Sequence, residues 1–283
     1  MTGATVAEAI RAAAERLAPG SDTARLDAEV LMAHALGATR SELLLRHLRD
    51  AAPEGFGSLV ERRAGHEPVA YIVGHQEFHG LPFRVSPAVL IPRGDSETLV
   101  EAALAARPGA ARVLDCGTGS GALLLAVLAS LPAARRVGVD RSGPSLAVAA
   151  GNSAALGLGH RSAFLQRDWT RPDWRAGLGL FDLVLANPPY VETGAALAPS
   201  VAAHEPAGAL FAGADGLADY RLLVPVLPAL LAPGGTALVE IGATQAEAVM
   251  ALGAGGGLAG GGAPPPFLGG AGGGYWLGNN VSP

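Results

Sequence analysis

Apolar residues recur every three or four positions through residues 5–64, with polar and charged residues between them. This spacing places the apolar side chains on one face of a helix, so it predicts helices rather than strands. The pattern is broken at Pro19-Gly20, at Gly37 and at Pro53, which are residue types typical of helix ends and turns. The first part of the chain is therefore predicted to be a small helical bundle, beginning with an amphipathic helix.

After the bundle the pattern changes to short β-like pieces. They read VAYIVGHQEFHG and LPFRVSP, and Gly80 and Pro82 separate them. Short β-like runs around such breakers predict a β-hairpin, which we place in a linker at residues 67–94. The next segment, SETLVEAALAA, returns to helical spacing, and Ser96 stands where its hydroxyl is expected to cap that helix.

Beyond this helix, short apolar runs alternate with helical segments. The expected strands read RVLDCG, RRVGVD, SAFLQRD, FDLVLANPP and GTALVEIG, and the helices between them include ALLLAVLAS, PSLAVAAGNSAAL and DYRLLVPVLPALLA. This alternation predicts right-handed βαβ units on a largely parallel sheet, so we assign residues 95–250 to a doubly wound α/β domain. Ligands of such sheets bind at the carboxyl ends of the strands, and we expect the active site there.

The last segment, residues 251–283, is rich in glycine and proline and nearly uncharged. Such a composition buries too little apolar surface to offset the entropy lost on ordering, so a disordered extension is expected. Phe267, Tyr275 and Trp276 leave one alternative open, a short edge strand that docks onto the sheet.

Composition narrows the function classes. A chain with 49% hydrophobic and 16% charged residues can build a sizeable core. The net charge of -5, without an arginine or lysine cluster, argues against stable binding to nucleic acid. A single cysteine, Cys116, excludes a disulfide framework and a cysteine-rich zinc site and favours the cytoplasm. The longest apolar stretch, residues 122–131, is too short to span a membrane, and the charged N-terminus does not read as a secretion signal.

A glycine-rich turn follows the first expected strand of the α/β domain. The stretch VLDCGTGSGA ends its strand at Asp115 and supplies glycines at 117, 119 and 121 before a helix. Glycine lets a backbone turn tightly and approach a ligand, and the helix offers free N–H groups. Asp140 ends the next strand, where an acid would hold ribose hydroxyls. These residues predict a nucleoside-bearing cofactor and do not separate NAD from S-adenosylmethionine.

The stretch LANPPYVE, residues 185–192, makes that separation. Two consecutive prolines end the strand, since each lacks an N–H and has a fixed φ. The side-chain carbonyl of Asn187 and the main-chain carbonyl of Pro188 can together accept both hydrogens of a substrate NH2 group, while Pro188 and Pro189 hold these acceptors rigid. Tyr190 is placed to stack on a planar group. The motif predicts methyl transfer to a planar nitrogen.

NPPY after a strand, together with DCGTGSG and GVD, resembles class I S-adenosylmethionine-dependent methyltransferases that modify adenine N6 or glutamine N5. The stretch EPVAYIVGHQEFHGLPFRVSPAVLIPRGDSETLVE, residues 67–101, is similar to the linker of the HemK/PrmC family of release-factor glutamine methyltransferases. HEPAGALFAGADGL, residues 204–217, resembles that family too. The resemblance implies a sheet of the seven-stranded methyltransferase type, preceded by a small helical bundle and a β-hairpin linker.

The resemblance also implies the reaction, methylation of the glutamine in the Gly-Gly-Gln motif of peptide chain release factors. The helical domain, residues 1–66, and the hairpin would grip this protein substrate. We expect a monomer without a metal. The residues expected to bind the cofactor are Asp115, Gly117, Thr118, Gly119, Ser120, Gly121, Asp140, Trp169 at the adenine, and Asn187. Those expected to hold the glutamine are Asn187, Pro188, Pro189 and Tyr190, and Asn187, Pro188 and Tyr190 are the expected catalytic residues.

Two departures from the family pattern stand out. The linker has Gly94 and Ser96 where the family usually has proline and threonine, which loosens a turn and keeps the hydroxyl. The glycine-rich tail replaces a terminal pair of strands with a charged segment, so we expect the last strands to be missing.

Other functions stay open at this point. Glutamine methylation of a ribosomal protein would use the same motif, and adenine methylation would need a basic face. A non-catalytic module that binds release factor or cofactor is suggested only by the abnormal tail, while Asn187 and the intact turn glycines favour activity. An NAD oxidoreductase would leave NPPY unexplained. Cys116 is expected to be a packed thiol. His75 and His79 lie four apart in the hairpin and not on a helix, and no acidic third ligand is spaced for zinc, so we expect substrate-facing or surface residues. Arg93 and Glu97 are expected to form a salt bridge and a cap at the mouth of the pocket.

Overall fold

The computed structural model describes residues 4–260 and 275–280, and the chain divides into two compact units. The first unit comprises Met1–His75 and Leu197–His204, and the second comprises Gln76–Ala196 and Glu205–Pro283. Each unit is built around its own core.

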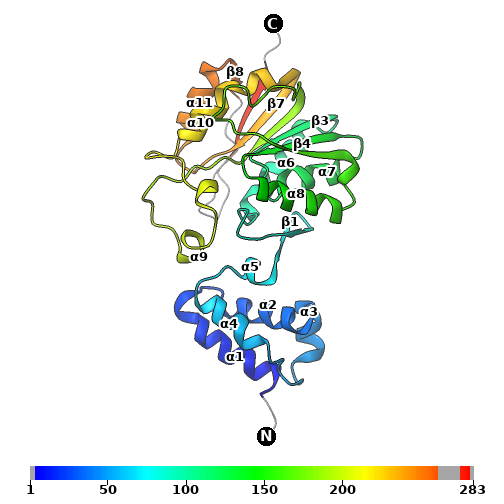
Figure 1. The fold of residues 1–283 in the computed structure, drawn as a ribbon, viewed down its shortest axis with the longest axis vertical. Helices are drawn as coiled ribbons and strands as arrows, with labels where there is room; N and C mark the ends of the chain where they lie inside the picture. The colour runs from blue at the N-terminus through cyan, green and yellow to red at the C-terminus, as the bar shows by residue number, and fades with distance from the viewer. Residues whose placement is uncertain (1–3, 261–274, 281–283) are drawn as a thin grey trace. The chain divides into compact units, whose positions relative to one another are not determined.

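The first unit is helical, as the sequence predicts (Figure 1). Its elements are α1 (Val6–Leu17), η1 (Ala18–Gly20), α2 (Ala24–Leu36), α3 (Arg40–Glu42), η2 (Leu43–His47), α4 (Phe56–Ala64), α5 (Val69–Val73) and α9 (Pro199–Ala202). Helix α1 begins with a capping box, in which Thr5 accepts from the Glu8 backbone N–H and Glu8 accepts from the Thr5 N–H at 2.8 Å. Its apolar face, including Val6 and Ile10, is fully buried in the core of the unit.

Residues 69–73 correct one expectation, because VAYIV is helix α5 and not a β-like piece. The β-branched residues suggested a strand, but the turn residues on either side decide the structure. The carbonyl of Pro68 accepts from the backbone N–H groups of Tyr71 and Ile72, which closes a helical turn. Gly74 ends the helix with φ at +81°, a conformation that favours glycine. The hairpin is therefore shorter than expected and consists of β1 (His75–Phe78) and β2 (Leu81–Arg84).

The second unit contains a seven-stranded sheet in the order β5-β4-β3-β6-β7-β9-β8. Five strands run parallel, namely β3 (Arg112–Cys116), β4 (Arg135–Asp140), β5 (Ser162–Gln166), β6 (Phe181–Ala186) and β7 (Leu231–Glu240). The remaining helical elements are η3 (Gly94–Ser96), α6 (Glu97–Ala106), α7 (Ala122–Ser130), α8 (Gly143–Ala155), η4 (Gly159–Arg161), η5 (Ala207–Ala209), α10 (Ala218–Leu223), η6 (Val224–Leu230) and α11 (Ala246–Gly255). The doubly wound fold is confirmed.

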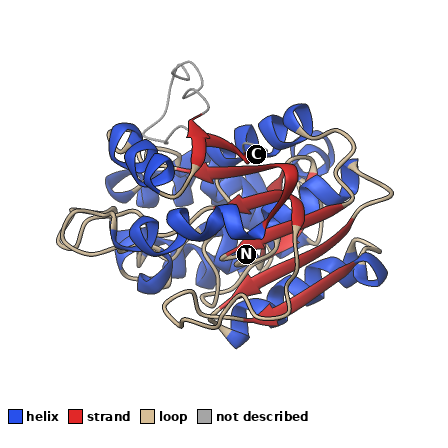
Figure 2. Cartoon of the chain, turned by 90° about the horizontal axis from the view of Figure 1, so that it is seen from above, coloured by secondary structure: helices blue, strands red, loops and turns tan. Residues whose placement is uncertain are grey.

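Helices cover both faces of this sheet (Figures 1 and 2). Alternate residues of β6 show the two layers, because Leu183 and Leu185 pack in the cluster that holds α6 and α7, while Val184 packs in the cluster that holds α10. A strand buried on both faces reads as a continuous apolar run, which is why FDLVLA is not alternating.

The end of the chain corrects a second expectation. Strand β9 (Tyr275–Asn280) pairs antiparallel with β7 on one side and with β8 (Leu258–Gly260) on the other. The last strands are therefore present. Tyr275 and Trp276 do belong to a short strand that docks onto the sheet, but this strand lies between β7 and β8 and not at the edge. Phe267 lies outside the described residues. Composition misled the prediction because ladder hydrogen bonds come from the backbone, which glycine supplies as well as any other residue.

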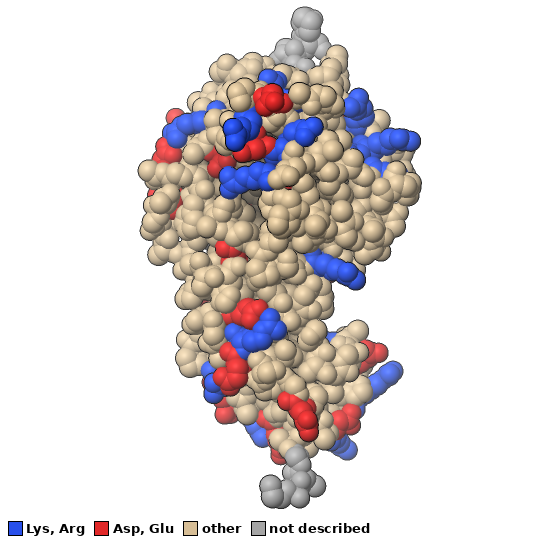
Figure 3. All heavy atoms as spheres, in the orientation of Figure 1, with Lys and Arg blue, Asp and Glu red and all other residues tan. Residues whose placement is uncertain are grey.

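Basic and acidic side chains both lie on the surface drawn in Figure 3. All 20 basic residues other than histidine are arginines, and on the face drawn in Figure 3 they are interspersed with acidic side chains. In the described part of the chain, none of the helices combines the length and the apolar character that crossing a bilayer requires.

Candidate active site

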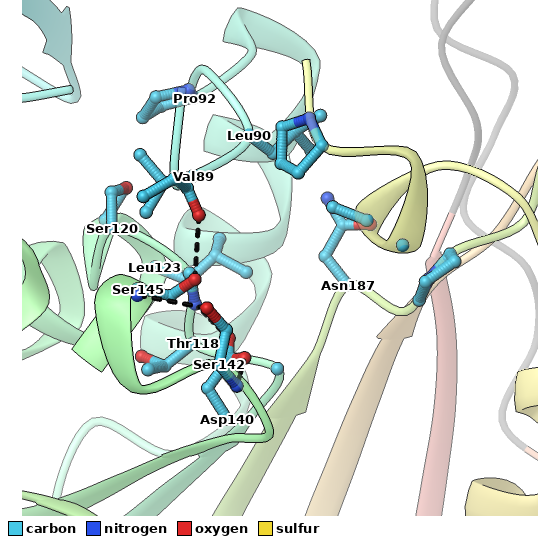
Figure 4. A pocket seen from close by; sticks show the side chains of 18 of the residues that line it. Val89, Leu90, Pro92, Thr118, Ser120, Leu123, Asp140, Ser142, Ser145 and Asn187 are labelled. Atoms are coloured by element: carbon cyan, nitrogen blue, oxygen red, sulfur yellow. Dashed lines mark hydrogen bonds between the residues drawn. The ribbon is translucent and has the colours of Figure 1, made fainter. Parts of the chain in front are cut away.

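The carboxyl ends of the central parallel strands meet at one edge of the sheet. Cys116 of β3 pairs with Val139 of β4 and with Ala186 of β6, and Ala186 pairs in turn with Val239 of β7. This register brings together the residues that follow each strand, and a pocket opens there (Figure 4). Its wall includes eight of the predicted site residues: Gly117, Thr118, Gly119, Ser120, Asp140, Trp169, Asn187 and Pro189.

The glycine-rich turn forms one side of the pocket. Gly117 has φ at +76°, and a Cβ there would lie 3.1 Å from the ring of Trp169. Gly121 has φ at +83° and lies behind the pocket wall, where a Cβ would lie 3.1 Å from Leu125 and 3.2 Å from Ala149. Glycine is thus required at both positions, for the backbone conformation and for close approach of a neighbour. The turn leaves the start of α7 directed at the pocket.

Two acids flank the turn in different environments. Asp140 binds the turn itself, accepting from the Gly119 N–H at 3.0 Å and the Ser142 N–H at 2.9 Å, and its carboxylate lines the pocket. Asp115 is buried, and one of its oxygens accepts from Thr118 Oγ1 at 2.7 Å while the other has no hydrogen-bond partner among the described residues. Burial, with a further contribution from the Asp140 charge, raises the pKa of Asp115 to about 7. Asp140 is available to a ligand, and Asp115 lies beneath the turn.

Trp169 is fixed against the glycine-rich turn. Its indole Nε1 donates to Asp219 Oδ1 at 2.7 Å, and its ring lies over Gly117. This bond holds a flat apolar surface in the pocket wall, as a purine ring requires. Asp219, in the first turn of α10, was missed by sequence reasoning, because an acid there is an ordinary feature of a helix start.

Asn187 follows β6 on the other side of the pocket and is labelled there in Figure 4. Its Nδ2 donates to Ser96 Oγ at 3.4 Å, and it also bonds to the carboxylate of Glu240. The amide is therefore held through its nitrogen. Pro189 lines the pocket, and Pro188 joins it to Asn187 in the chain.

Tyr190 lies away from the pocket wall. The side chain is partly buried among the apolar residues around α10, and its hydroxyl lies 3.5 Å from Glu240 Oε1. Burial, followed by the nearby Glu240 charge, raises the pKa of Tyr190 to about 12, so the phenol stays protonated. The loop that carries it is fixed by Gln245 Nε2, which donates to the Tyr190 carbonyl at 3.1 Å.

The expected capping role of Ser96 is wrong. Ser96 stands before α6, but its hydroxyl donates to Glu240 Oε2 at 2.6 Å and makes no bond to the helix N–H groups. The preceding turn η3 already supplies carbonyls to the N–H of Glu97, which leaves the hydroxyl free for another partner. Glu240 was also missed. The feature that identified Asp140 applies to Glu240 as well, because each is an acid at the end of a buried strand.

The other predicted residues have structural roles. Arg93 lines the pocket and forms an ion pair with Glu205, as expected. Glu97 caps nothing in its own helix and accepts instead from the His79 backbone N–H at 2.8 Å. Cys116 is a buried free thiol whose pKa is raised well above its usual value by burial. The described residues contain no group of three histidine, cysteine or acidic side chains that could hold a metal ion.

Comparison with known proteins identifies the family. The sequence matches the PrmC N-terminal domain over residues 8–74 and a methyltransferase domain over residues 109–248. The release factor glutamine methyltransferase of Caulobacter vibrioides is 44% identical over 258 residues, covering 88% of each chain. The chain belongs to the release factor glutamine methyltransferase family. The family member of Cereibacter sphaeroides is 45% identical over 89% of this chain and 91% of its own, and that of Geobacter sulfurreducens is 44% identical over 82% of both.

Family membership makes S-adenosylmethionine the cofactor of this methyltransferase, and the pocket fits it. Asp140 presents a carboxylate beside the glycine-rich turn, Trp169 presents a flat ring, and Leu90, Ile91 and Leu123 add apolar wall. The NAD oxidoreductase alternative is thereby excluded.

Proposed function

We propose that this chain transfers a methyl group from S-adenosylmethionine to the side-chain N5 of the glutamine in the Gly-Gly-Gln motif of peptide chain release factors. The observation that carries the proposal is the amide of Asn187, held through its nitrogen at the wall of a pocket that fits the cofactor. The family relatives, named as release factor glutamine methyltransferases, support the same substrate.

When bound, S-adenosylmethionine supplies an electrophilic methyl group on a positively charged sulfur. The protein residues recognise the rest of the molecule. We propose that Asp140 accepts from the ribose hydroxyls, that Trp169 contacts the adenine, and that the turn from Gly117 to Gly121 lies along the methionine part, with Asp115 and Thr118 supporting it from below. Apolar residues around the pocket exclude water and favour a reaction in which a charge is lost.

The glutamine is activated by position. Its amide nitrogen is a poor nucleophile, because the lone pair is delocalised into the carbonyl. Asn187 Oδ1 and the Pro188 carbonyl accept the two amide hydrogens, and the prolines hold both acceptors in place. Orientation toward the methyl group then supplies much of the rate. Tyr190 is proposed to support this loop through Glu240.

Successive segments of the chain have different proposed roles. We infer that the helical domain, residues 1–66, and the hairpin linker, residues 67–94, grip the release factor, while residues 95–250 carry out the transfer and the tail completes the sheet. The enzyme acts as a monomer in the cytoplasm on a protein substrate without a stable complex with nucleic acid. The single cysteine, which is buried and free, supports the cytoplasmic setting, and the mixed charges on the face drawn in Figure 3 support the lack of a stable complex with nucleic acid.

The test is methyl transfer from labelled S-adenosylmethionine to a purified release factor. We expect label on the wild-type factor and none on a factor whose motif glutamine is changed to alanine. Asn187→Ala enzyme should lose at least about 100-fold in kcat, because the amide is no longer oriented. It should remain folded, since it loses only one weak bond to Ser96 and one to Glu240.

Label on a ribosomal protein instead would move the substrate to the alternative left open by the sequence. Cofactor binding without transfer to either protein would favour the non-catalytic module.

A further inference from the structure

A buried acid lies directly behind the amide of Asn187. Glu240 is the last residue of β7, and only 6% of it is exposed to solvent. Buried acids are normally paired with a base, yet among the described side chains Glu240 forms no ion pair with an arginine or a histidine. Its neighbours are polar groups of the pocket wall and of the NPPY loop, which suggests a role beyond stability.

Among the described residues, the side chains that hydrogen-bond to this carboxylate are all donors. Ser96 Oγ donates to Oε2 at 2.6 Å, Tyr190 lies at 3.5 Å from Oε1, and Asn187 donates from its amide. An ionised carboxylate only accepts hydrogen bonds, so it matches three donors without conflict. The set is complementary to a negative charge at Glu240.

This charge determines which end of the Asn187 amide faces the pocket. An amide has a donor end and an acceptor end of nearly the same shape. The acceptor end would be repelled by the carboxylate, so the nitrogen is the end that faces Ser96 and Glu240. The oxygen is then the end left free for a substrate at the pocket that Asn187 lines. The substrate NH2 group needs that oxygen. If the amide were reversed, the NH2 group of Asn187 would face the NH2 group of the substrate, and both are hydrogen-bond donors.

We propose that Glu240 is a positioning residue that holds the amide of Asn187 with its oxygen toward the substrate nitrogen, with Ser96 as the bridge between them. The role of the oxygen rests on the proposed function. Ser96 strengthens the arrangement because its hydroxyl donates to Glu240 and can therefore only accept from Asn187.

The same arrangement predicts a pH dependence. Burial raises the pKa of Glu240, and the hydrogen bonds from Ser96, Asn187 and Tyr190 oppose that rise. The other ionisable groups that act on it are Asp95 before α6, whose charge raises the pKa further, and Tyr220 on α10, whose hydroxyl donates to the Glu240 carbonyl at 2.9 Å. Protonated Glu240 could donate to Asn187 Oδ1 and so permit the reversed amide. Activity should therefore fall on the acid side as Glu240 gains its proton.

Glu240→Gln tests the proposal with almost no change of shape. A glutamine at 240 can donate to Asn187 Oδ1, so the reversed amide is no longer repelled. With release factor as substrate, we expect kcat to fall by about 100-fold or more, while KM and the dissociation constant of the cofactor stay within about threefold. The acid limb of the wild-type kcat profile should disappear, because glutamine does not titrate.

Asp182→Asn is the matched control. Asp182 accepts from the N–H groups of Ala111 and Arg112 at the other end of the sheet, so this change also removes one carboxylate that bonds to its surroundings. The kcat of the Asp182→Asn enzyme should stay within about twofold of the wild-type value. A Glu240→Gln enzyme with wild-type kcat, or one that loses only cofactor affinity, would overturn the proposal.

A second measurement is independent of the substrate. In the nuclear magnetic resonance spectrum of the cofactor-bound enzyme, the side-chain NH2 signals of Asn187 should show one proton bonded to a carboxylate and protected from exchange. These features should be lost in Glu240→Gln. Identical Asn187 signals in the two proteins would refute the positioning role even if wild-type enzyme failed to methylate a release factor, a failure that would count against the proposed function alone.

Discussion

Asp115 and Glu240 are acids buried at the carboxyl ends of strands in the same sheet, and their surroundings give them different tasks. Glu240 is surrounded by hydrogen-bond donors, and one of them, Ser96, lines the pocket. Asp115 accepts from Thr118 Oγ1 and, more weakly, from the Leu124 backbone, and it lies near the charge of Asp140. A carboxylate in the second setting is costly to ionise. Ionisation of Asp115 beneath the glycine-rich turn therefore lowers the stability of the folded protein.

The first prediction concerns that cost. The folded-state pKa of Asp115, about 7, lies above the ordinary value of 3.8. Below pH 3.8, Asp115 is protonated in both the folded and the unfolded protein. Between pH 3.8 and about 7, it has lost its proton in the unfolded protein but keeps it in the folded one. The free energy of unfolding therefore falls as pH rises through this range. Between pH 5 and 8, wild type should lose about 2–3 kcal/mol more than Asp115→Asn, given about 1.4 kcal/mol per pKa unit.

Urea unfolding of the cofactor-free protein at several pH values measures this difference. Thr118→Val serves as the opposing variant, because it removes the hydrogen bond that lowers the pKa of Asp115 and should steepen the loss. Parallel stability curves for wild type and Asp115→Asn would contradict the prediction.

How far sequence anticipates the site depends on what holds each residue. Asp140 ends a strand and Asn187 follows one, and both lie in motifs whose spacing implies their chemistry, so the sequence alone predicts both at the pocket that they line. Ser96, Asp219 and Glu240 act through partners that are distant in the chain; Ser96 and Glu240, for example, are 144 positions apart. Local sequence carries no sign of such pairs. Tyr190 shows the same limit, because its motif suggests stacking while its hydroxyl lies near Glu240.

At the scale of elements, the glycine-rich end of the chain closes the sheet. Strand β9 lies between β7 and β8, and it pairs with β7 from Thr236 to Glu240, the segment that ends at the active site. Without it, β7 would expose a row of unpaired backbone groups. Local sequence patterns predict the buried parallel strands because these contain runs of apolar side chains. They do not predict β9, which is held by backbone pairing with its two neighbours. The short helix α5 was missed for a related reason, because Pro68 and Gly74 outweigh the β propensity between them.

A chain that ends after Gly260 lacks β9, and we predict that it is less stable than the full chain. The loss should reach several kcal/mol, because the ladder to both neighbours is removed. The exposed edge of β7 should also promote self-association. Denaturant unfolding and size-exclusion chromatography measure the two effects. A chain that ends after Asn280 keeps every paired residue of β9 and should behave as the full chain does. Equal stability of the two truncated chains would show that β9 contributes nothing.

At the scale of the molecule, each unit has its own core, and every residue that lines the cofactor pocket belongs to the second unit. The first unit fixes its helices with internal charge pairs, such as the buried Asp27 with Arg63 at 2.7 Å. It therefore has the independent packing expected of a recognition domain. Its surface also carries Leu45, which is 82% exposed on the π-helical turn η2. A leucine so exposed contributes little to the core, so a charge can be placed there without disturbing the packing of the unit.

The recognition role of the helical unit yields a prediction that separates binding from chemistry. If the unit grips the release factor at a surface that includes Leu45, Leu45→Glu should raise KM for the release factor by about tenfold, since burying a charge at an interface costs more than about 1 kcal/mol. The cofactor pocket lies in the other unit, so kcat and cofactor affinity should be unchanged. Leu180→Glu is the matched control, because Leu180 is 46% exposed and immediately precedes β6, at the end of the strand opposite Asn187. Steady-state methylation of release factor by both variants decides the matter. A rise in KM with Leu45→Glu alone assigns recognition to the helical unit, whereas equal behaviour of the two variants means that Leu45 is not part of the surface that binds the release factor.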